Sequence, residues 1–471
     1  MDHEEFRARG HELIDWIADY VEGVGSRRVA PDVRPGEVRA SLPAHPPAEP
    51  ESWEAVRRDL DEVILPGLVH WQHPSFFAYF PSNTSYPSIL GELLAAGLGV
   101  QGMSWVTSPA CTELETLVLD WMVELLALPR QFLSTSPRGG GVIQGSASEA
   151  TLVAILAARS RATQGAVNAG GDTTELTAYT TSQAHSSIEK GLRIAGIGTD
   201  RTRIVPHDSR FGMRPDALAA MVEADRSAGL TPCIVCATRG TTSSLAFDPV
   251  PEIAAVTAQH GIWLHVDAAM SGIAALAPEH RWVNDGLERA DSYCTNPHKW
   301  MGVNFDCDLF WTADRAAVLQ ALSILPEYLR SSAAESGAAI DYRDWQIPLG
   351  RRFRALKLWL TLRLDGVESI RTMLRGHVDL TQRLAAEVAD DPRFQLVGDT
   401  PLSLLVLRLT GDDADARTDA LIDAANATGE ALFTRTVLDG RVALRFSIGA
   451  RSTEWTHVEA AWRLLQRLAD A

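Results

Sequence analysis

The feature that most constrains the fold is an alternation of helical and strand-like segments between residues 85 and 315. Apolar residues recur at helical spacing in TELETLVLDWMVELLAL, from Thr112, and in SEATLVAILAARSRA, from Ser148. Around them stand short apolar runs that end in polar residues or glycine: LTAYTTSQ, PCIVCATRG, GIWLHVDAAM, DSYCTNPH and CDLFWTAD. This alternation predicts a mostly parallel sheet covered by helices. In such sheets the functional groups gather at the carboxyl ends of the strands.

The flanking parts of the chain have different patterns. An amphipathic helix that needs a partner surface is predicted over residues 4–22, from the spacing of Phe6, Leu13, Ile14, Ile17 and Val21. Six prolines between residues 31 and 50 predict an extended connector. After residue 356 the strands PLSLLVLRL and VALRFSIGA and the helix HVEAAWRLLQRLA predict a small α+β domain. We expect an N-terminal helical arm (1–85), a large α/β domain (86–356) and a small C-terminal domain (357–471).

Charge and cysteine content narrow the class of partner. A formal net charge of −17 over 471 residues, with no basic block, disfavours nucleic acid and anionic membranes. The acidic N-terminus and the absence of a long apolar run favour a cytoplasmic protein with neither a signal peptide nor a membrane span. Five cysteines are too few, and odd in number, for a disulfide framework. Cys233 and Cys236 are predicted to be buried strand thiols, and the expected substrate is a small molecule.

A candidate nucleophile follows the strand in DSYCTNPHKW. Lys299 stands there beside Asn296, His298 and Trp300. Enclosure by apolar and aromatic neighbours lowers the pKa of a lysine, as an imine-forming amine requires. The alternative is an ordinary surface lysine at a strand end.

Two further segments suit a flat, anionic ligand. Asp267 closes the strand of HVDAAMSG, where a carboxylate can pair with a cationic ring nitrogen. The alternative is that Asp267 caps the next helix. In GGGVIQGSASEATL, the residues Ser146, Ala147 and Ser148 lie between a strand and a strong helix. Backbone N–H groups and the helix dipole favour a phosphate there, and the alternative is plain capping.

A histidine completes the predicted pocket. His185 ends the strand in TTSQAHSSIEKG, among small hydroxyl residues, where its imidazole can lie over a flat ring. The alternative is a structural histidine. An amine, a carboxylate, an anion cradle and a stacking ring all fall at strand ends, so one pocket can hold all four.

Long blocks of this sequence match a known family. They are HPSFFAYFPS, SWVTSPACTELETLVLDWM, GVIQGSASEATL, WLHVDAA, NPHKW, NFDCD and DYRDWQIPLGRRFRALKLW. The chain resembles the aromatic L-amino-acid decarboxylases, which are group II pyridoxal 5'-phosphate (PLP) enzymes, from its first helix to its last. The resemblance implies an α/β fold, the PLP-dependent transferase fold type I, and a homodimer with shared active sites. It also implies conversion of an aromatic L-amino acid to the arylalkylamine and CO2, with no metal.

The resemblance also assigns roles to residues of this chain. Lys299 forms the imine with PLP, Asp267 pairs with its pyridine nitrogen, and His185 stacks on its ring. Further cofactor contacts fall on Ser146, Ala147, Ser148, Thr242, Ala269, Asn296 and His298. Tyr328, in the predicted catalytic loop LPEYLRSS, matches the tyrosine that protonates Cα. Similar enzymes that make aldehydes carry phenylalanine there, so an aromatic aldehyde synthase is the alternative activity.

The substrate pocket is the least regular part of the resemblance. Its residues are Trp71, Tyr79, Phe80, Pro81, Ser82, Gln101, Met103, His185 and Gly350. Gln101 and Met103 stand where animal members typically have isoleucine and phenylalanine, and Met270 replaces a usual tyrosine. Similar histidine decarboxylases carry serine in place of Gly350, which leaves room here for a larger ring. Indole and phenol side chains are both expected to fit, and the preferred amino acid stays open.

Two other classes of function compete with this interpretation. A metallohydrolase could use His185, His265, Asp267 and His298, but the sequence has no compact ligand motif such as H-E-x-x-H. A non-catalytic binding protein could keep the fold, but the set of lysine, aspartate, histidine and tyrosine is intact.

Overall fold

The computed structural model describes residues 1–324 and 339–470. The chain forms two compact units. The larger unit holds residues 82–381 and 397–406, and the smaller holds residues 1–81, 382–396 and 407–471. The predicted three-part division of the chain stays a prediction.

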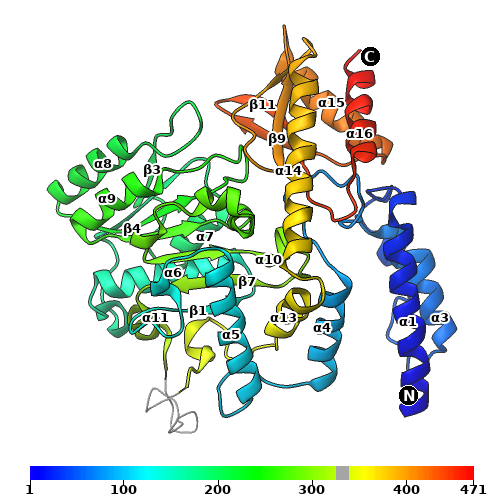
Figure 1. Cartoon of the computed structure of the whole chain (residues 1–471), viewed down its shortest axis with the longest axis horizontal. Coiled ribbons are helices and arrows are strands. Elements are labelled where there is room, and N and C mark those ends of the chain that lie inside the picture. The colour runs from blue at the N-terminus through cyan, green and yellow to red at the C-terminus, as the bar shows by residue number, and fades with distance from the viewer. Residues whose placement is uncertain (325–338, 471) are drawn as a thin grey trace. The chain divides into compact units, whose positions relative to one another are not determined.

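A mixed sheet forms the centre of the larger unit (Figure 1). Within the described residues it has seven strands, in the order β1-β7-β6-β5-β4-β2-β3. They are β1 (Gly140–Gln144), β2 (Leu176–Thr181), β3 (Thr202–Val205), β4 (Thr231–Thr238), β5 (Trp263–Asp267), β6 (Ser292–Thr295) and β7 (Asp308–Thr312). The strands from β6 to β3 are parallel, whereas β7 is antiparallel to both of its neighbours. The predicted mostly parallel sheet is confirmed.

The strands read as continuous apolar runs because both faces of the sheet are covered. Every residue of β1, β2, β5, β6 and β7 is buried. Helix α6 packs against β4 to β7, and α8 and α9 pack against β4. The helices of this part are α4 (Tyr86–Leu98), α5 (Pro109–Leu125), α6 (Ala147–Ala162), α7 (Ser186–Ile194), α8 (Pro215–Ser227), α9 (Val250–His260), α10 (Pro297–Trp300), α11 (Arg315–Leu322), α13 (Ala355–Leu364) and α14 (Val367–Ala389), the last of which continues into the smaller unit.

Strand direction decides where polar groups meet. β1, β2, β4, β5 and β6 run the same way, because β7 is antiparallel to both β1 and β6. Their carboxyl ends therefore share one edge of the sheet, and β7 begins at that edge. The segments that carry Ser146, His185, Asp267 and Lys299 all leave the sheet there.

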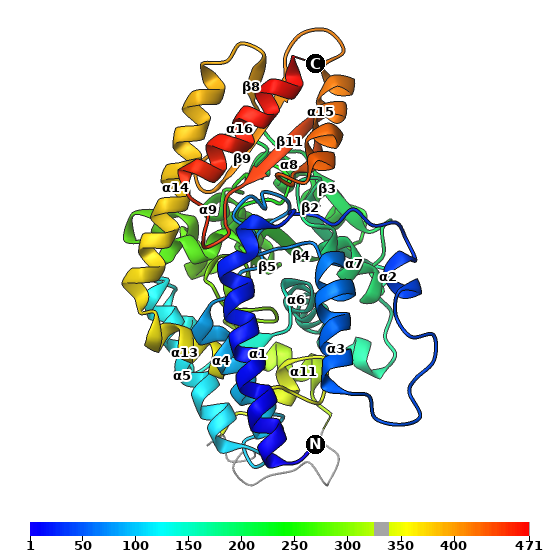
Figure 2. The same ribbon diagram turned by 90° about the vertical axis from the view of Figure 1, so that its right-hand side faces the viewer.

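A second sheet has the order β10-β11-β9-β8 among the described residues. Its strands are β8 (Phe394–Leu396), β9 (Leu404–Leu409), β10 (Thr434–Leu438) and β11 (Arg441–Ser447). Helix α15 (Ala414–Thr428) packs on β11, and α16 (Trp455–Ala469) packs on α15 (Figure 2). The predicted C-terminal strands and closing helix are confirmed as β9, β11 and α16.

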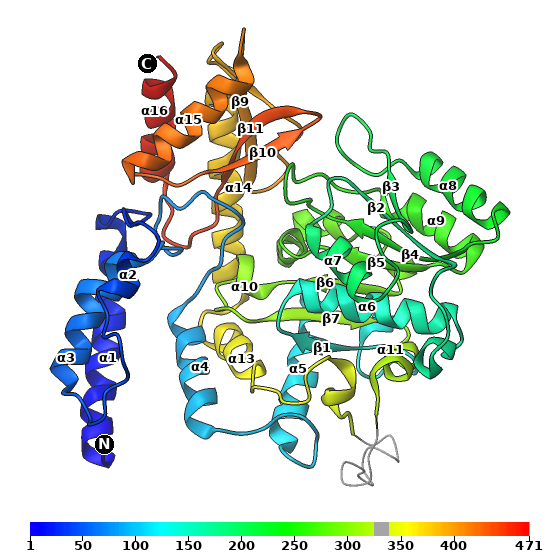
Figure 3. The same ribbon diagram turned by 180° about the vertical axis from the view of Figure 1, so that it is seen from behind.

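The N-terminal segment begins with the predicted amphipathic helix, α1 (His3–Gly23), in which no residue is buried. The proline-rich stretch is interrupted by the single turn α2 (Glu37–Ala40), and α3 (Trp53–Asp59) follows. α1 and α3 lie side by side, joined by a 2.8 Å hydrogen bond from Trp53 Nε1 to Glu12 (Figure 3). No helix in the described part of the chain has the length and apolar character needed to cross a membrane.

Candidate active site

Lys299 lies in the short helix α10, directly after β6. It is half-buried, between the buried side chains of His298 and Trp300. Its N–H donates to the carbonyl of Asn296 at 3.0 Å, and its carbonyl accepts from Asn83 Nδ2 at 2.9 Å. The backbone that carries this lysine is therefore held at the strand ends, which disfavours the surface-lysine alternative.

Asp267 is the last residue of β5 and is 4% exposed. Its Oδ1 accepts a hydrogen bond from the N–H of Ala269 at 2.9 Å and contacts the Sγ of Cys294 at 3.8 Å. The next helical turn, Ser271–Leu276, starts after Met270 and has no side-chain cap. Asp267 does not cap it, and its carboxylate stays at the strand ends.

His185 caps the start of α7 and borders the same site. Its Nδ1 accepts from the N–H of Ser187 at 3.2 Å, so the neutral imidazole carries its proton on Nε2. Partial burial and then the Lys299 ammonium lower the pKa of His185, while Asp267 opposes this shift. These interactions place the three side chains within electrostatic reach of one another. His185 keeps part of its surface exposed in the single chain, so it can cap α7 and still offer a surface to a ligand.

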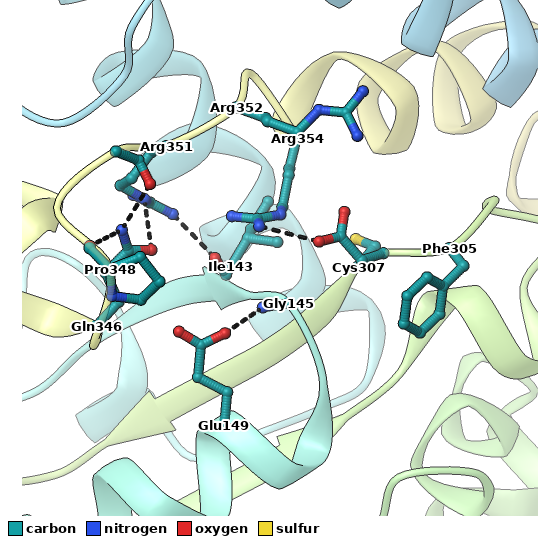
Figure 4. Close-up of polar contacts among 12 residues, drawn as sticks. Ile143, Gly145, Glu149, Phe305, Cys307, Gln346, Pro348, Arg351, Arg352 and Arg354 are labelled. Carbon is teal, nitrogen blue, oxygen red and sulfur yellow. Dashed lines mark hydrogen bonds and ion pairs between the residues drawn. The ribbon is translucent and has the colours of Figure 1, made fainter. Parts of the chain in front are cut away.

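The N-terminus of α6 has backbone N–H groups that can bind an anion. Ser146 occupies the N-cap position but makes no side-chain capping bond, which disfavours plain capping. Instead Glu149 folds back, and its Oε2 accepts from the N–H of Gly145 at 2.9 Å (Figure 4). The first N–H groups of a helix have no partner within that helix. Those of Ala147 and Ser148 can therefore donate to a phosphate.

A buried pair follows β6. His298 Nδ1 accepts from the N–H of Cys307 at 3.0 Å, and its Nε2 lies 3.2 Å from the side-chain amide of Asn296. Burial and then the Lys299 ammonium lower the pKa of His298 to about 3, so the ring is neutral near pH 7. Because Nδ1 accepts, the neutral ring carries its proton on Nε2, which needs the amide oxygen of Asn296 as its acceptor, so the N–H groups of that amide are left to donate. This amide keeps hydrogen-bonding capacity for a ligand.

A buried polar network fixes the segment that carries Gly350. Arg351 donates to Glu115 at 2.7 Å. It also donates to the carbonyl of Ile143 at 2.9 Å and to Gln346 at 3.0 Å (Figure 4). Arg354 pairs with Asp306 at 2.9 Å. The network joins this segment to β1, to α5 and to the turn before β7.

The remaining predicted residues are placed as follows. Gln101 lies against Gly350, Met103 is half-buried, Met270 is buried, and Thr242 and Ser82 are half-buried. The other four belong to the smaller unit: Trp71, Tyr79, Phe80 and Pro81. The rings of Trp71 and Tyr79 stack with centroids 5.5 Å apart. Tyr328 lies outside the described residues.

Sequence reasoning missed three residues of this edge. Asn83 donates to the carbonyl of Lys299, Cys294 contacts Asp267, and Asp308 is a fully buried carboxyl at the start of β7. An acidic residue at the start of the apolar run DLFWT was the available signal for Asp308. No local signal marks Asn83, because it is 216 positions from Lys299 in the chain.

These groups fit PLP. A lysine amine, a buried carboxylate, an imidazole with a fixed tautomer and a helix start with free N–H groups meet at the strand ends, and Asn296 adds a buried side-chain amide. The fold and this arrangement define an α/β enzyme of fold type I that depends on PLP.

Comparisons with known proteins agree with this fold and cofactor. Residues 35–410 match the pyridoxal-dependent decarboxylase conserved domain. The chain is 44% identical to a mouse aromatic-L-amino-acid decarboxylase, covering 100% of this chain and 98% of that protein. It is 45% identical to an Arabidopsis thaliana phenylacetaldehyde synthase, covering 100% and 97%. The crystal structure of Oryza sativa TDC with PLP and tryptamine superimposes with a TM-score of 0.96 at 38% identity, covering 100% and 98%. The chain belongs to the pyridoxal-dependent decarboxylase family, and it is a PLP-dependent carboxy-lyase.

Proposed function

We propose that this chain removes the α-carboxylate of an aromatic L-amino acid and releases the arylalkylamine and CO2. The observation that carries the proposal is the convergence of Lys299, Asp267 and His185 at one edge of the sheet, beside the open start of α6. The relatives named above act on aromatic amino acids or form an aromatic aldehyde, which supports the substrate class.

Each residue has a distinct task in this proposal. Lys299 provides the amine that binds the aldehyde carbon of PLP. Asp267 would hold the proton on the pyridine nitrogen, and His185, whose tautomer is fixed by Ser187, would cover the ring. When bound, PLP supplies the electron sink for breaking the bond between Cα and the carboxylate. The protein would have to orient that bond and shield it from water.

The phosphate needs a separate anchor. The N–H groups of Ala147 and Ser148 lie at the positive end of the α6 dipole and provide donors for it. The hydroxyls of Ser146 and Ser148 and the amide of Asn296 add further donors. Binding the phosphate here leaves Lys299 to hold the other end of the cofactor.

Proton delivery decides the product. Tyr328 is proposed to protonate Cα after CO2 leaves, which gives the amine. The aldehyde synthase stays the alternative activity, because a phenylacetaldehyde synthase is as similar to the chain as the decarboxylases are. The tyrosine at position 328 favours the amine.

A homodimer in the cytoplasm completes the proposal. Helix α4 exposes one apolar face, with Leu90 at 43%, Leu93 at 52% and Leu94 at 49% exposure. A second copy is a suitable cover for such a face, since large exposed apolar patches mark interaction sites.

The five cysteines are free and buried, as expected in a reducing compartment. The oligomeric state is measured by light scattering, and a monomer at micromolar concentration contradicts this part.

The experiment that tests the function measures all products from tryptophan, 5-hydroxytryptophan, tyrosine, DOPA and phenylalanine. We expect amine and CO2 in equal amounts from at least one of them, without peroxide. Aldehyde, ammonia and peroxide in place of amine would establish the alternative. The kcat/KM values across the panel identify the preferred ring.

A further inference from the structure

His298 and Asn296 both follow β6 and are both buried, at 4% and 1% exposure. The family resemblance assigns both residues to the cofactor, but their hydrogen bonds give them different tasks. A neutral imidazole has one N–H to donate, whereas an asparagine amide has two N–H groups and an oxygen that accepts. The partners of each side chain decide which of these atoms is left to face a ligand.

Several contacts hold the imidazole of His298 in place. Its Nδ1 accepts the backbone N–H of Cys307 at 3.0 Å. Its own backbone N–H donates to the carbonyl of Cys307 at 3.5 Å, and its carbonyl accepts the N–H of Asn83 at 3.1 Å. The ring of Phe305 meets it edge-on, with centroids 4.8 Å apart. The imidazole therefore cannot turn over without breaking the bond at Nδ1.

The turn that supplies the Cys307 N–H is itself anchored. Asp306, the preceding residue, pairs with Arg354 at 2.9 Å and lies 3.6 Å from the ammonium of Lys357. Arg354 is the N-cap residue of α13, and Lys357 lies in the first turn of that helix. The side chain of Lys357 is 1% exposed and also pairs with Glu92 of α4 at 3.0 Å. The donor to the imidazole is thus tied to two helices.

The imidazole of His298 is uncharged near pH 7. Burial and then the Lys299 ammonium lower its pKa to about 3, Lys357 acts in the same direction, and Asp306 opposes the shift. With Nδ1 accepting, the one proton of the ring is on Nε2, 3.2 Å from the side-chain amide of Asn296. Both ring nitrogens are then engaged within the protein, and no N–H of the imidazole is left for an anion.

The amide of Asn296 has the opposite property. It has to turn its oxygen toward the Nε2–H of His298, because an N–H bonds only to an acceptor. Its NH2 group then lies at the other end of the amide, which is buried and has no partner among the described residues. A buried donor without an acceptor costs free energy. That end of the amide therefore suits an anionic acceptor such as a phosphate.

We propose that His298 is a positioning residue for phosphate binding: the N–H of Cys307 fixes its Nε2–H tautomer, which turns the NH2 group of Asn296 toward the phosphate of PLP. The orientation of the amide rests on the contacts described above, and only the identity of the anion rests on the phosphate site of the proposed function. A reversed amide would direct its oxygen at the phosphate oxygens, and two acceptors repel. His298 thus strengthens phosphate binding without touching the phosphate.

The tautomer is measured by 15N NMR of the full chain labelled at histidine. A ring nitrogen that carries a proton and one that only accepts differ widely in 15N chemical shift, so both tautomers and the charged ring are distinguishable. The signals of His298 are assigned by their absence from His298→Leu, or from His298→Gln if the first variant does not fold. We expect a proton on Nε2 and none on Nδ1 near pH 7, with and without PLP.

The link to the phosphate is measured by comparing the Kd values of PLP and of pyridoxal, which lacks the phosphate. In His298→Leu the Kd for PLP should rise about tenfold, the scale of one hydrogen bond to a charged group, while that for pyridoxal changes little. His298→Gln should lose less, because its amide can still donate to Asn296. The matched control is His73→Leu, since Nδ1 of this buried histidine also accepts a backbone N–H, from Ser75 at 2.9 Å. The control should keep the wild-type ratio of the two Kd values.

A double-mutant cycle shows whether His298 acts through Asn296. Asn296→Ala removes the donor, so adding His298→Leu should cause no further loss of affinity for PLP. Additive losses overturn the action through Asn296, and equal losses for PLP and pyridoxal overturn the link to the phosphate. A proton on Nδ1 in the wild type overturns the whole proposal. None of these measurements uses substrate, so a failure of the proposed decarboxylation would leave their interpretation intact.

Discussion

The backbone N–H of Arg351 donates to the Oε1 of Gln101 at 2.6 Å, although the two residues are 250 positions apart. The bond occupies the acceptor end of the Gln101 amide and turns its Nε2 toward Gly350. A Cβ added at Gly350 would lie 3.3 Å from that nitrogen. In this chain, therefore, the glycine predicted to leave room for a large ring also leaves room for Gln101.

Gly350→Ser is expected to narrow the proposed pocket. The added side chain has to displace the Gln101 amide, so the space for an indole ring shrinks more than the space for a phenol. We expect kcat/KM for tryptophan to fall about tenfold or more, because serine adds two heavy atoms and one methylene in a tight pocket already has about a tenfold effect, and that for tyrosine to fall less. Steady-state kinetics on both substrates measures the difference.

A matched control and a rescue accompany this variant. Gly376 of α14 has no atom within 4 Å of an added Cβ, so Gly376→Ser should leave the ratio of the two kcat/KM values unchanged. Adding Gln101→Ala to Gly350→Ser removes the displaced amide and should restore part of the tryptophan activity. Equal losses for both amino acids in Gly350→Ser would show that the contact does not select the ring.

Lys299→Ala should abolish turnover and the visible absorbance of bound PLP while the chain still folds. The proposed phosphate and ring contacts remain, but no amine is left to bind the aldehyde carbon. Absorbance measures the bound PLP, steady-state assays measure turnover, and thermal unfolding shows whether the chain folds. Lys190→Ala, which removes an exposed lysine of α7, is the control. Wild-type absorbance and activity in Lys299→Ala would assign the nucleophile elsewhere.

Asp267→Asn should lower kcat about a hundredfold, the scale on which the loss of one preorganised electrostatic partner slows an enzyme. An amide cannot keep the pyridine nitrogen protonated, although it can still accept the N–H of Ala269. Stability should change far less than turnover. Single-turnover kinetics and thermal unfolding of the same preparation separate the two effects, and an unaltered kcat would remove the assigned role.

His265 provides a prediction for stability against pH. Burial lowers its pKa from 6.5 to about 4, because the imidazole lies inside the sheet with Nδ1 bonded to Ser292. The unfolded chain therefore binds this proton more readily than the folded one. Stability should be lost as pH falls from about 6.5 to about 4, by about 3 kcal/mol from this residue. Urea unfolding of the wild type and of His265→Gln at several pH values measures this loss. The free energy of unfolding should depend less steeply on pH in the variant.

Local patterns predicted most elements, because burial on both sides leaves a readable apolar run. β2, β5, β6 and β7 fall within predicted runs, and β4 begins one residue before its run. The direction of β7 was not predictable, since an antiparallel strand covered on both faces has the same composition as a parallel one. β3 was missed because it is only four residues long and only its last residue is buried.

The residues of the site were also only partly predictable from the sequence. The placement of Asp267 and Lys299 at strand ends was predictable, because parallel strands bring their ends together. The partners that hold them were not. Arg351 meets Glu115 across 236 positions, and Gln101 meets Arg351 across 250. Such contacts depend on tertiary packing, which no local period encodes.

Tyr328→Phe tests the choice between the two products. The change removes one hydroxyl and leaves every residue that is proposed to bind PLP. Without the acid, protonation of Cα should slow about a hundredfold, the usual contribution of a positioned acid. Molecular oxygen then has time to react at Cα before the proton arrives. The products expected are aldehyde, ammonia and peroxide, with one O2 and one water consumed for each CO2 released.

The control for this variant is Tyr86→Phe, which removes the hydroxyl of an exposed tyrosine at the start of α4. It should keep the wild-type ratio of amine to aldehyde. Oxygen uptake and chromatography of products, run in air and under nitrogen, distinguish slow protonation from general loss of activity, because only the former makes the product depend on oxygen. If Tyr328→Phe releases amine at the wild-type rate without peroxide, the proton comes from another group, such as His185 or a bound water.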